Sequence, residues 1–382
     1  MELKIDSKKE KIIIISLVAI IVFVLSFLTI KIVQAPSFFY EKQVIEKDDI
    51  EKTINSSTLP EINIKTDPEI SLIFVGDIML SRTVNARMEK YKDYTWPFVK
   101  ISDFLDKADL VIGNLESPFL KNSKSYQVLT GSFSFKANPL SVAGLKLANF
   151  SLLSLANNHT INQGRQGIID TIDILQENDI NYIGAGLNEE EARKPVIIEL
   201  SGYNFAFLAY AYPDDNSIAT ENRAGIPNMN IEKMKEDIEL LKETEGNIDF
   251  IIILMHAGTE YVTEPNWQQK EFARAAIESG ADMIVGHHPH WPQIFEFYRD
   301  KPIIYSLGNF VFDQMWSEET RQGLLLKMTW QNGLKELELI PTKIYDYGQV
   351  EILSSSTERS LILKRIKAND EGIIFQKTNE ND

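Results

Sequence analysis

The segment ADMIVGHHPH, residues 281–290, carries an apolar run directly into three of the five histidines of the chain. An uninterrupted apolar run of this length is typical of a strand buried on both faces of a sheet. Alternate residues of an extended segment point to one side, so His288 and His290 are expected to face a common site and His287 to face away. The segment therefore predicts a buried strand that ends in two metal-ligating imidazoles, with structural histidines as the alternative.

The same form recurs along the chain, where short apolar runs alternate with segments of helical period. The other predicted strands lie in SLIFVGD (71–77), ADLVIGNLE (108–116), FSLLSLANNH (150–159), NFAFLAYAY (204–212), DFIIILMHAG (249–258) and KPIIYSLGN (301–309). The predicted helices cover residues 138–147, 165–178, 231–243 and 265–279. Asn138 can cap the first of them, and Pro139 suits its first turn. This alternation predicts a layered α/β fold.

Polar side chains follow these apolar runs at the point where each predicted strand ends. They are Asp77, Asn114, Glu116, Asn158, His159, His256, His288 and His290. In α/β sheets the carboxyl ends of the strands converge on one crevice, so we expect these groups to meet. Carboxylate, amide and imidazole ligands together suit Mn, Fe or Zn better than Ca, and a carboxylate can bridge two ions about 3.5–4 Å apart. The alternative is that Asp77 and Glu116 cap the helices that follow them.

The composition excludes several classes of protein. The formal net charge of −16 argues against nucleic-acid binding, which needs clustered lysine and arginine. The chain has no cysteine, which excludes disulfides, thiolate metal sites and cysteine nucleophiles. The sequence holds no H-E-x-x-H, G-x-S-x-G or Walker pattern. Trp267, Trp291 and Trp316 lie near the polar groups, where we expect them either to line a groove or to pack in the core and rim.

The N-terminal region predicts a membrane anchor. Residues Ile12 to Ile30 carry no charge, and the run is close to the roughly 20 residues that cross a bilayer as a helix. Lysines are denser before the run than after it, which favours a cytoplasmic N-terminus. We predict a cytoplasmic segment at 1–11, a transmembrane anchor at 12–33, an extracellular stalk at 34–69, a main domain at 70–345 and a C-terminal helical tail at 346–382. A cleaved signal peptide is the alternative for the apolar run.

Six segments resemble, in order and approximate spacing, the CapA-type capsule-biosynthesis proteins. They are VGDIML (75–80), GNLESP (113–118), LANNH (155–159), HAGTEY (256–261), GHHPH (286–290) and YSLGNFVF (305–312). That family is linked to poly-γ-glutamate synthesis and export and is related to the calcineurin-like metallophosphoesterases. The resemblance covers residues 71 to 345. It implies a layered, metallophosphoesterase-like β-sandwich flanked by helices and preceded by one transmembrane helix.

The resemblance also implies roles for individual residues. It implies two divalent ions, of Mn, Fe or Zn, held by Asp77, Glu116, Asn158, His256, His288 and His290. His159 would be catalytic, as an acid or a transition-state donor. Substrate contact or support of the ligands would fall to Asn114, Glu260, His287 and Asn309, with loop and cap hydrogen bonding as the alternative for Glu260 and Asn309.

One position departs from the phosphoesterase pattern, and one more belongs to the signatures of the CapA group. Met79 stands where the phosphoesterases have a histidine two residues after the first aspartate. A thioether is a poor ligand for a hard ion, so the first metal site is expected to be weak, to use water, or to be empty. Asp313 belongs, with Glu260 and Asn309, to the signatures that are particular to the CapA group.

The leading hypothesis is a membrane-anchored, extracellular CapA-like protein in poly-γ-glutamate capsule or polymer assembly, with a metal centre that contacts the anionic polymer. A metal-dependent hydrolase or transferase would fit this role. Its partners would be the polymer, membrane synthase or export subunits, and the bilayer that holds its N-terminal helix. Two alternatives stay open: a wall-facing metallophosphoesterase with His159 as general acid, and a non-catalytic scaffold, which Met79 favours.

Overall fold

The structure, a computed structural model, describes residues 68–126, 132–212, 216–244 and 247–377. The predicted cytoplasmic segment and transmembrane anchor lie outside the described residues, as does nearly all of the predicted stalk. Within the described ranges, no helix is both long enough and apolar enough to cross a membrane.

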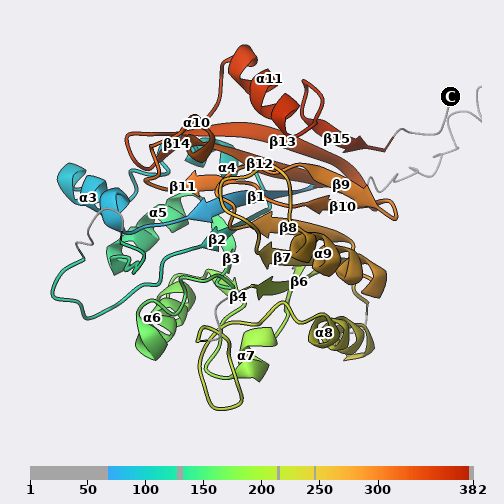
Figure 1. Cartoon of the computed structure of the whole chain (residues 1–382), viewed down its shortest axis with the longest axis horizontal. Coiled ribbons are helices and arrows are strands. Elements are labelled where there is room, and N and C mark those ends of the chain that lie inside the picture. Colours follow the sequence, from blue (N-terminus) through green and yellow to red (C-terminus); the bar gives the residue numbers. More distant parts are fainter. Residues whose placement is uncertain (1–67, 127–131, 213–215, 245–246, 378–382) are drawn as a thin grey trace, which may run out of the picture. The chain divides into compact units, whose positions relative to one another are not determined.

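The first of two sheets has nine strands within the described part of the chain (Figure 1). Its main path runs in the order β14, β13, β12, β1, β2, β3, β4, while β11 pairs with β1 and β15 with β13. The bounds of these strands are β1 (Ile70–Ile78), β2 (Leu110–Leu115), β3 (Phe150–Ser154), β4 (Asn181–Ile183), β11 (Asn309–Val311), β12 (Gln322–Trp330), β13 (Leu334–Tyr345), β14 (Gln349–Ile352) and β15 (Ile373–Gln376). Strands β1 to β4 are parallel, whereas β12 to β15 join the sheet in antiparallel pairs.

The second sheet has six described strands, in the order β5, β6, β7, β8, β10, β9. Their bounds are β5 (Val196–Leu200), β6 (Tyr203–Ala211), β7 (Phe250–His256), β8 (Met283–His287), β9 (Phe295–Tyr298) and β10 (Lys301–Ile304). The four central strands, β6, β7, β8 and β10, are parallel to one another. Parallel strands buried on both faces explain why these segments are continuously apolar in the sequence.

Helices cover the outer faces of the sheets (Figure 1). Their bounds are α3 (Arg82–Tyr91), α4 (Ser102–Leu105), the 3₁₀ turn η1 (Pro139–Ser141), α5 (Val142–Leu147), α6 (Gly164–Gln176), α7 (Glu189–Arg193), α8 (Ile231–Thr244), α9 (Trp267–Ser279), α10 (Glu318–Arg321) and α11 (Ser356–Arg365). Helix α9 begins with a capping box, in which Asn266 and Gln269 each bond the other's backbone N–H, and ends at Gly280 in the left-handed conformation.

The two sheets share one hydrophobic cluster. On β6, Phe205, Phe207 and Ala209 belong to the cluster that also holds the core of the first sheet. The alternate β6 residues, Ala206 and Leu208 among them, pack with residues of α8 and α9 on the other face. Trp330 of β12 joins the sheets directly, because its ring lies edge-to-face on Phe205 at 5.2 Å and on Phe250 at 5.3 Å.

The predicted mixed α/β fold is confirmed. The seven apolar runs form β1, β2, β3, β6, β7, β8 and β10, and each predicted helix overlaps an observed one. The predicted tail, residues 346–382, differs from expectation. Its described part, up to residue 377, holds the helix α11, but β14 and β15 within it pair with β13, since that strand offers backbone groups on the side away from β12.

Strand register and two glycines bring the polar residues together. Asp77 of β1 is the register partner of Asn114 of β2, and His256 of β7 is the partner of His287 of β8. Gly76 lets the segment before β11 approach β1, because a Cβ at this position would lie 1.9 Å from the carbonyl oxygen of Gly308. Gly286 does the same on β8, where a Cβ would lie 2.0 Å from the carbonyl oxygen of Tyr305.

Candidate metal centre

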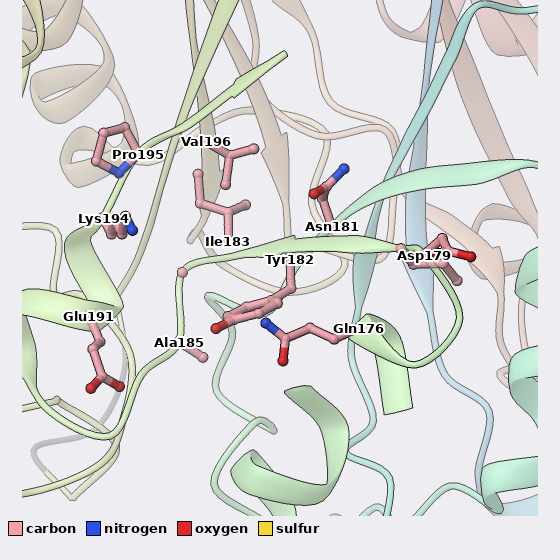
Figure 2. A pocket seen from close by; sticks show the side chains of 12 residues that line it. Gln176, Asp179, Asn181, Tyr182, Ile183, Ala185, Glu191, Lys194, Pro195 and Val196 are labelled. Carbon is pink, nitrogen blue, oxygen red and sulfur yellow. The ribbon is translucent and has the colours of Figure 1, made fainter. Parts of the chain in front are cut away.

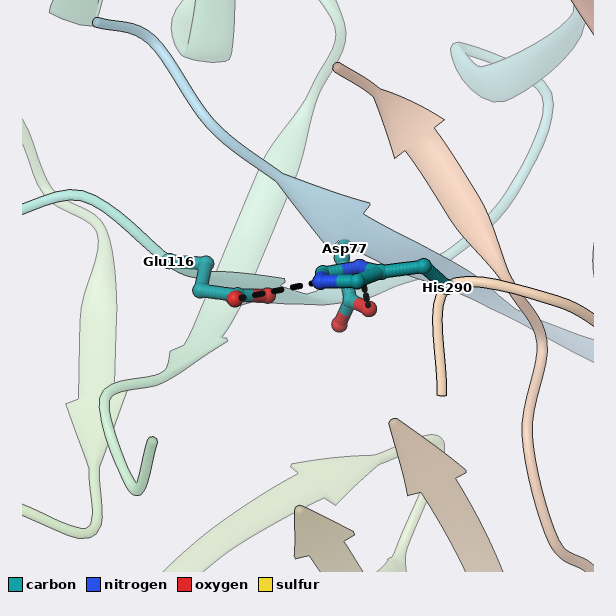
Figure 3. Close-up of side chains that lie close together, drawn as sticks. All are labelled: Asp77, Glu116 and His290. Atoms are coloured by element: carbon teal, nitrogen blue, oxygen red, sulfur yellow. Dashed lines mark ion pairs between the residues drawn. The ribbon is translucent and has the colours of Figure 1, made fainter. Parts of the chain in front are cut away.

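Asp77, Glu116 and His290 form a buried group at the ends of β1 and β2 (Figure 3). One ligand atom from each lies within 4.8 Å of the others. Asp77 Oδ2 lies 3.3 Å from Nδ1 of His290, and Glu116 Oε1 lies 4.0 Å from its Nε2. Two carboxylate oxygens and an imidazole nitrogen at this spacing can hold one divalent cation.

Asn309 determines which nitrogen of His290 has a lone pair that can bind a cation. The Asn309 Nδ2 group donates to the carbonyl oxygen of Thr320 and to Gln314 Oε1, so its Oδ1 is the acceptor that faces His290 Nδ1 at 2.9 Å. The proton of neutral His290 is therefore on Nδ1, and the lone pair of Nε2 faces Glu116. Asn309 thus orients a candidate ligand, the geometry that the expected supporting role requires.

His256, Asn158 and His288 form a second group beside the first. His256 Nε2 lies 2.9 Å from Asn158 Oδ1, and the rings of His256 and His288 are 4.8 Å apart. The ring of His288 is in turn 6.1 Å from that of His290. The structure therefore brings all six sequence-predicted ligands into one connected cluster.

Two buried atoms of this cluster have no hydrogen-bond partner. They are Glu116 Oε1 and His288 Nδ1. Unpaired buried acceptors are costly, and both atoms are ligands that a divalent cation accepts. The donor set thus fits a divalent metal.

The backbone around His288 and His290 differs from the predicted extended segment. Both residues have positive φ, 98° and 60°, so the chain bends as it leaves β8. The bend directs the backbone N–H of His288 to Asp77 Oδ2 at 3.3 Å. This turn, and not the alternation of side chains along a strand, makes the two imidazoles face one cluster. The predicted extended conformation of this segment is therefore wrong.

His287, Glu260 and Met79 lie around the cluster without joining it. His287 Nε2 lies 3.1 Å from the carbonyl oxygen of Val75, so this side chain links β8 to β1. Glu260 is half-buried after β7, and its negative charge acts on Glu116. The sulfur of Met79 accepts a hydrogen bond from the backbone N–H of Ser81 at 3.1 Å. The weak acceptor of Met79, its sulfur, is therefore engaged by a backbone N–H.

Burial and mutual charge perturb the titrating groups of the cluster. Burial alone would raise the pKa of Asp77, but the hydrogen bond and charge of His290 lower it overall. The pKa of Glu116 is raised well above its usual range by burial and by the negative charges of Asp77 and Glu260. Burial also lowers the pKa of His256 well below normal, and the charge of His288 adds to this effect.

His159 lies against Glu116 and Phe135. Its ring is 4.0 Å from the Phe135 ring, and its Nε2 is 3.7 Å from Glu116 Oε1. Asn162 Oδ1 accepts the backbone N–H of Phe135, so it also accepts from His159 Nδ1 at 3.0 Å. Neutral His159 therefore carries its proton on Nδ1, and Nε2 is suited to accept a proton. The expected acid role would require protonation of Nε2, which burial opposes.

The metal-free chain is expected to lose about 3 kcal/mol of stability through His159 as the pH falls from 6.5 to 4. Burial lowers the pKa of His159 from 6.5 to about 4, and the charges of His290 and His288 act in the same direction. Between these pH values the unfolded chain takes up a proton that the folded chain does not. The stabilisation is therefore complete above pH 6.5 and is lost on acidification.

Urea unfolding of the wild-type chain and of His159→Phe, in chelator at pH 7.5 and at pH 4, measures this loss. Glu116, with its raised pKa, acts in the opposite direction, so the difference between the two proteins isolates His159. The phenylalanine variant should lose about 3 kcal/mol less on acidification than the wild type. Equal losses would show that folding does not lower the pKa of His159.

Two residues near the centre were missed by the sequence analysis. Asn157 is fully buried beside Asn114, and its place next to Asn158 in LANNH was an available signal. Arg82 forms a buried ion pair with Asp313, and its positive charge lowers the pKa of Glu116 against the larger opposing effects. Arg82 carries no local signal, because its partner is 231 residues away.

The tryptophans near the site divide between exposed and packed positions. Trp316 is 61% exposed and lies edge-to-face on Tyr261 at 4.8 Å, while Tyr261 stacks on His290 at 5.9 Å. Trp267 is 68% exposed and lines a pocket with residues that follow His256. Trp291 is half-buried. Trp316 therefore lies at the rim of the cluster, whereas the pocket that Trp267 lines includes none of the six candidate ligands.

A separate pocket of about 650 Å³ lies at the edges of the two sheets (Figure 2). Its lining comes from the end of α6, from β4, and from the segment between α7 and β5. Tyr182 lines it, and the pKa of this phenol is raised by burial and by the charge of Glu191. The lining includes none of the cluster residues, so the pocket is distinct from the candidate centre.

Two packed α/β sheets with carboxylates and imidazoles at adjoining strand ends define an α/β protein with a candidate divalent-metal centre. The chain belongs to the family described as "Bacterial capsule synthesis protein PGA_cap", whose model matches residues 71–314.

Relatives extend the match over most of the chain. The "Capsule biosynthesis protein CapA" of Bacillus anthracis is 33% identical over 321 residues, which cover 83% of this chain and 77% of the relative. The "PGA biosynthesis protein CapA" of Bacillus subtilis (strain 168) is 31% identical over 309 residues, 80% of either chain. Among solved structures, a 5'-nucleotidase precursor from Thermus thermophilus is 12% identical with a TM-score of 0.43, covering 75% of this chain and 55% of that one.

Proposed function

We propose that this chain acts in the synthesis or export of poly-γ-glutamate and that a divalent-metal centre in it contacts the anionic polymer. The observation that carries the proposal is the Asp77–Glu116–His290 group in a chain whose relatives are named for capsule and PGA biosynthesis. As part of this proposal, residues 12–33 anchor the chain in the cell membrane, residues 1–11 are cytoplasmic, and the main domain is extracellular. Membrane synthase or export subunits are the proposed protein partners.

Charge supports a metal at this site. The chain has a formal net charge of −16, and poly-γ-glutamate is itself a polycarboxylate, so the two repel each other in the absence of cations. A bound divalent ion would supply positive charge at the polymer and would activate a water molecule. The proposed activity is accordingly that of a metal-dependent hydrolase or transferase. The expectation of two ions comes from the family resemblance, and the donor groups around His290 and around His256 are where those ions would bind.

The side chains around the ligands fit such a reaction. His159 presents Nε2 toward Glu116, so it can accept a proton at the reacting group. Asn309 orients His290, and the ring of Tyr261 stacks on that of His290. Trp316 is exposed beyond Tyr261, where an extended polymer can pass over it.

Deletion of the gene in the organism that encodes it tests the proposal. Secreted polymer, measured as glutamate after acid hydrolysis of the high-molecular-mass fraction, should fall to background and return with the wild-type gene. Unchanged output in the deletion strain would exclude a role in poly-γ-glutamate production. Metal analysis of the purified full-length chain, kept in detergent and free of chelator, should find Mn, Fe or Zn.

A phosphoesterase acting at the cell wall is the second candidate function, favoured by His159 next to the metal ligands. It requires turnover of a small phosphomonoester or phosphodiester by the full-length chain in Mn²⁺. A panel of such esters left intact would count against it. A scaffold that holds synthase subunits together is the third candidate, and Met79, bonded to Ser81, is the observation in its favour.

A further inference from the structure

Asn114 lies at the centre of the candidate ligands. Its Nδ2 is 2.8 Å from Asp77 Oδ1, 3.2 Å from His256 Nδ1 and 3.4 Å from Glu116 Oε2. The side chain is fully buried. We propose that this amide limits the centre to one tightly held divalent ion, bound by Asp77, Glu116 and His290. The inference rests on the proposed metal centre and specifies its stoichiometry.

The orientation of the Asn114 amide is fixed through Asn157. Asn157 Oδ1 accepts the backbone N–H of His159 at 3.1 Å. Its Nδ2 must then be the group that donates, to the carbonyl oxygen of Leu115 at 2.9 Å and to Asn114 Oδ1 at 3.1 Å. With its oxygen held by Asn157, Asn114 can present only its N–H₂ group to the cluster.

An amide N–H₂ group donates hydrogen bonds and offers no lone pair to a cation. It engages Asp77 through Oδ1 and approaches Glu116 at Oε2. The oxygens outside these contacts are Asp77 Oδ2, which also accepts the backbone N–H of His288 at 3.3 Å and keeps a second lone pair, and Glu116 Oε1, which has no partner. Both lie near the His290 ring. One complete ligand set is therefore available on this side of Asn114.

The same amide also removes a potential ligand from the second group, which is formed by His256, Asn158 and His288. Because Asn114 donates to His256 Nδ1, the proton of neutral His256 is on Nε2, and that N–H points to Asn158 Oδ1. Both nitrogens of His256 are then engaged in hydrogen bonds, to Asn114 and to Asn158, so neither is free to bind a cation. His288 Nδ1 is left as an imidazole ligand with no carboxylate of its own group. A neutral set of this kind holds a divalent ion weakly.

Asn114→Asp tests the proposal, because aspartate has nearly the same shape and replaces the donor by a carboxylate oxygen. That oxygen would face Asp77 and Glu116, and a second cation would offset the repulsion of three carboxylates. Equilibrium dialysis of the full-length chain against Mn²⁺, followed by metal analysis, should give one tight ion for the wild type and two for Asn114→Asp. Electron paramagnetic resonance should show coupled Mn²⁺ only in the variant.

Asn222→Asp is the matched control, since Asn222 is exposed in a turn, and it should bind one ion. Two equally tight ions in the wild type would overturn the inference and leave the proposed metal centre intact. One ion in a folded Asn114→Asp chain would also overturn it. A wild-type chain that binds no Mn²⁺ would overturn the metal centre itself, so the two failures are distinguishable. If Asn114→Asp fails to fold, the wild-type stoichiometry alone decides.

Discussion

Replacing His288 and His290 together by alanine is expected to remove bound Mn²⁺ from the chain and to reduce polymer output to that of a deletion strain. The change takes one imidazole from each donor group, including the Nε2 that faces Glu116. Losing a group that merely orients a ligand weakens metal binding about 10–100-fold, so the loss of these ligands should exceed that range. Metal analysis of the full-length chain and complementation of the deletion strain measure the two effects.

The controls separate a metal role from a folding defect. Glu232→Ala with Lys235→Ala removes an exposed ion pair on α8, and this chain should keep both its metal and its polymer output. Thermal unfolding in chelator should show that the histidine variant is folded. A folded variant that binds no metal and still restores full polymer output would establish the scaffold function and exclude the catalytic one.

Most of the parallel strands were predictable because they are buried on both faces, whereas β4, with three residues of which one is exposed, was not identified. Burial on both sides gives uninterrupted apolar runs, such as Phe250–His256, and the strand-end rule then places the polar residues that follow. Capping residues made the helix starts predictable in the same way. Asn138 accepts the backbone N–H of Leu140, and Asn266 caps α9.

The antiparallel strands were not identified, and β13 shows why. Its sequence contains Pro341, which argues against a strand inside a sheet, since proline has no N–H for a ladder. In the structure, β15 pairs with residues 336–338 and β14 with residues 342–345. Pro341 lies between these two partners, where the missing N–H interrupts neither pairing. This division of one edge between two short strands depends on tertiary structure and has no local signal.

The sequence was enough to predict which residues meet at the site, but not the hydrogen bonds and backbone conformations that arrange them. Strand ends identified the six candidate ligands, whereas the hydrogen-bond chain from the His159 backbone through Asn157 to Asn114 joins two segments that are far apart in the sequence. The positive φ values of His288 and His290 likewise follow from contacts with Asp77 and Asn309. Hydrogen-bond direction, which decides whether an amide is a ligand or a donor, requires these contacts.

Arg82→Met is expected to lower the free energy of unfolding by about 3–5 kcal/mol. The Arg82 and Asp313 side chains are only 7% and 2% exposed, and they form a direct ion pair. Methionine can keep the contacts that the arginine makes over Phe135 and Phe312, so packing changes little. The loss comes from the Asp313 carboxylate, which would remain buried without its cationic partner. It would keep the hydrogen bond from the backbone N–H of Thr83, at 3.1 Å. Urea unfolding at pH 7.5 in chelator measures the change.

Arg299→Met is the matched control, because Arg299 shares the left-handed backbone, with φ of 50° against 47° for Arg82. Its ion pair with Glu278 is exposed, at 62% and 43%, so this change should cost less than about 1 kcal/mol. Adding Asp313→Asn to Arg82→Met removes the stranded charge and keeps an oxygen for Thr83, so most of the lost stability should return. Equal losses in the single and double variants would mean that the lost stability does not come from the stranded Asp313 carboxylate. Recovery in the double variant would instead assign the loss to the stranded carboxylate, which links α3 to the segment after β11 beside the metal ligands.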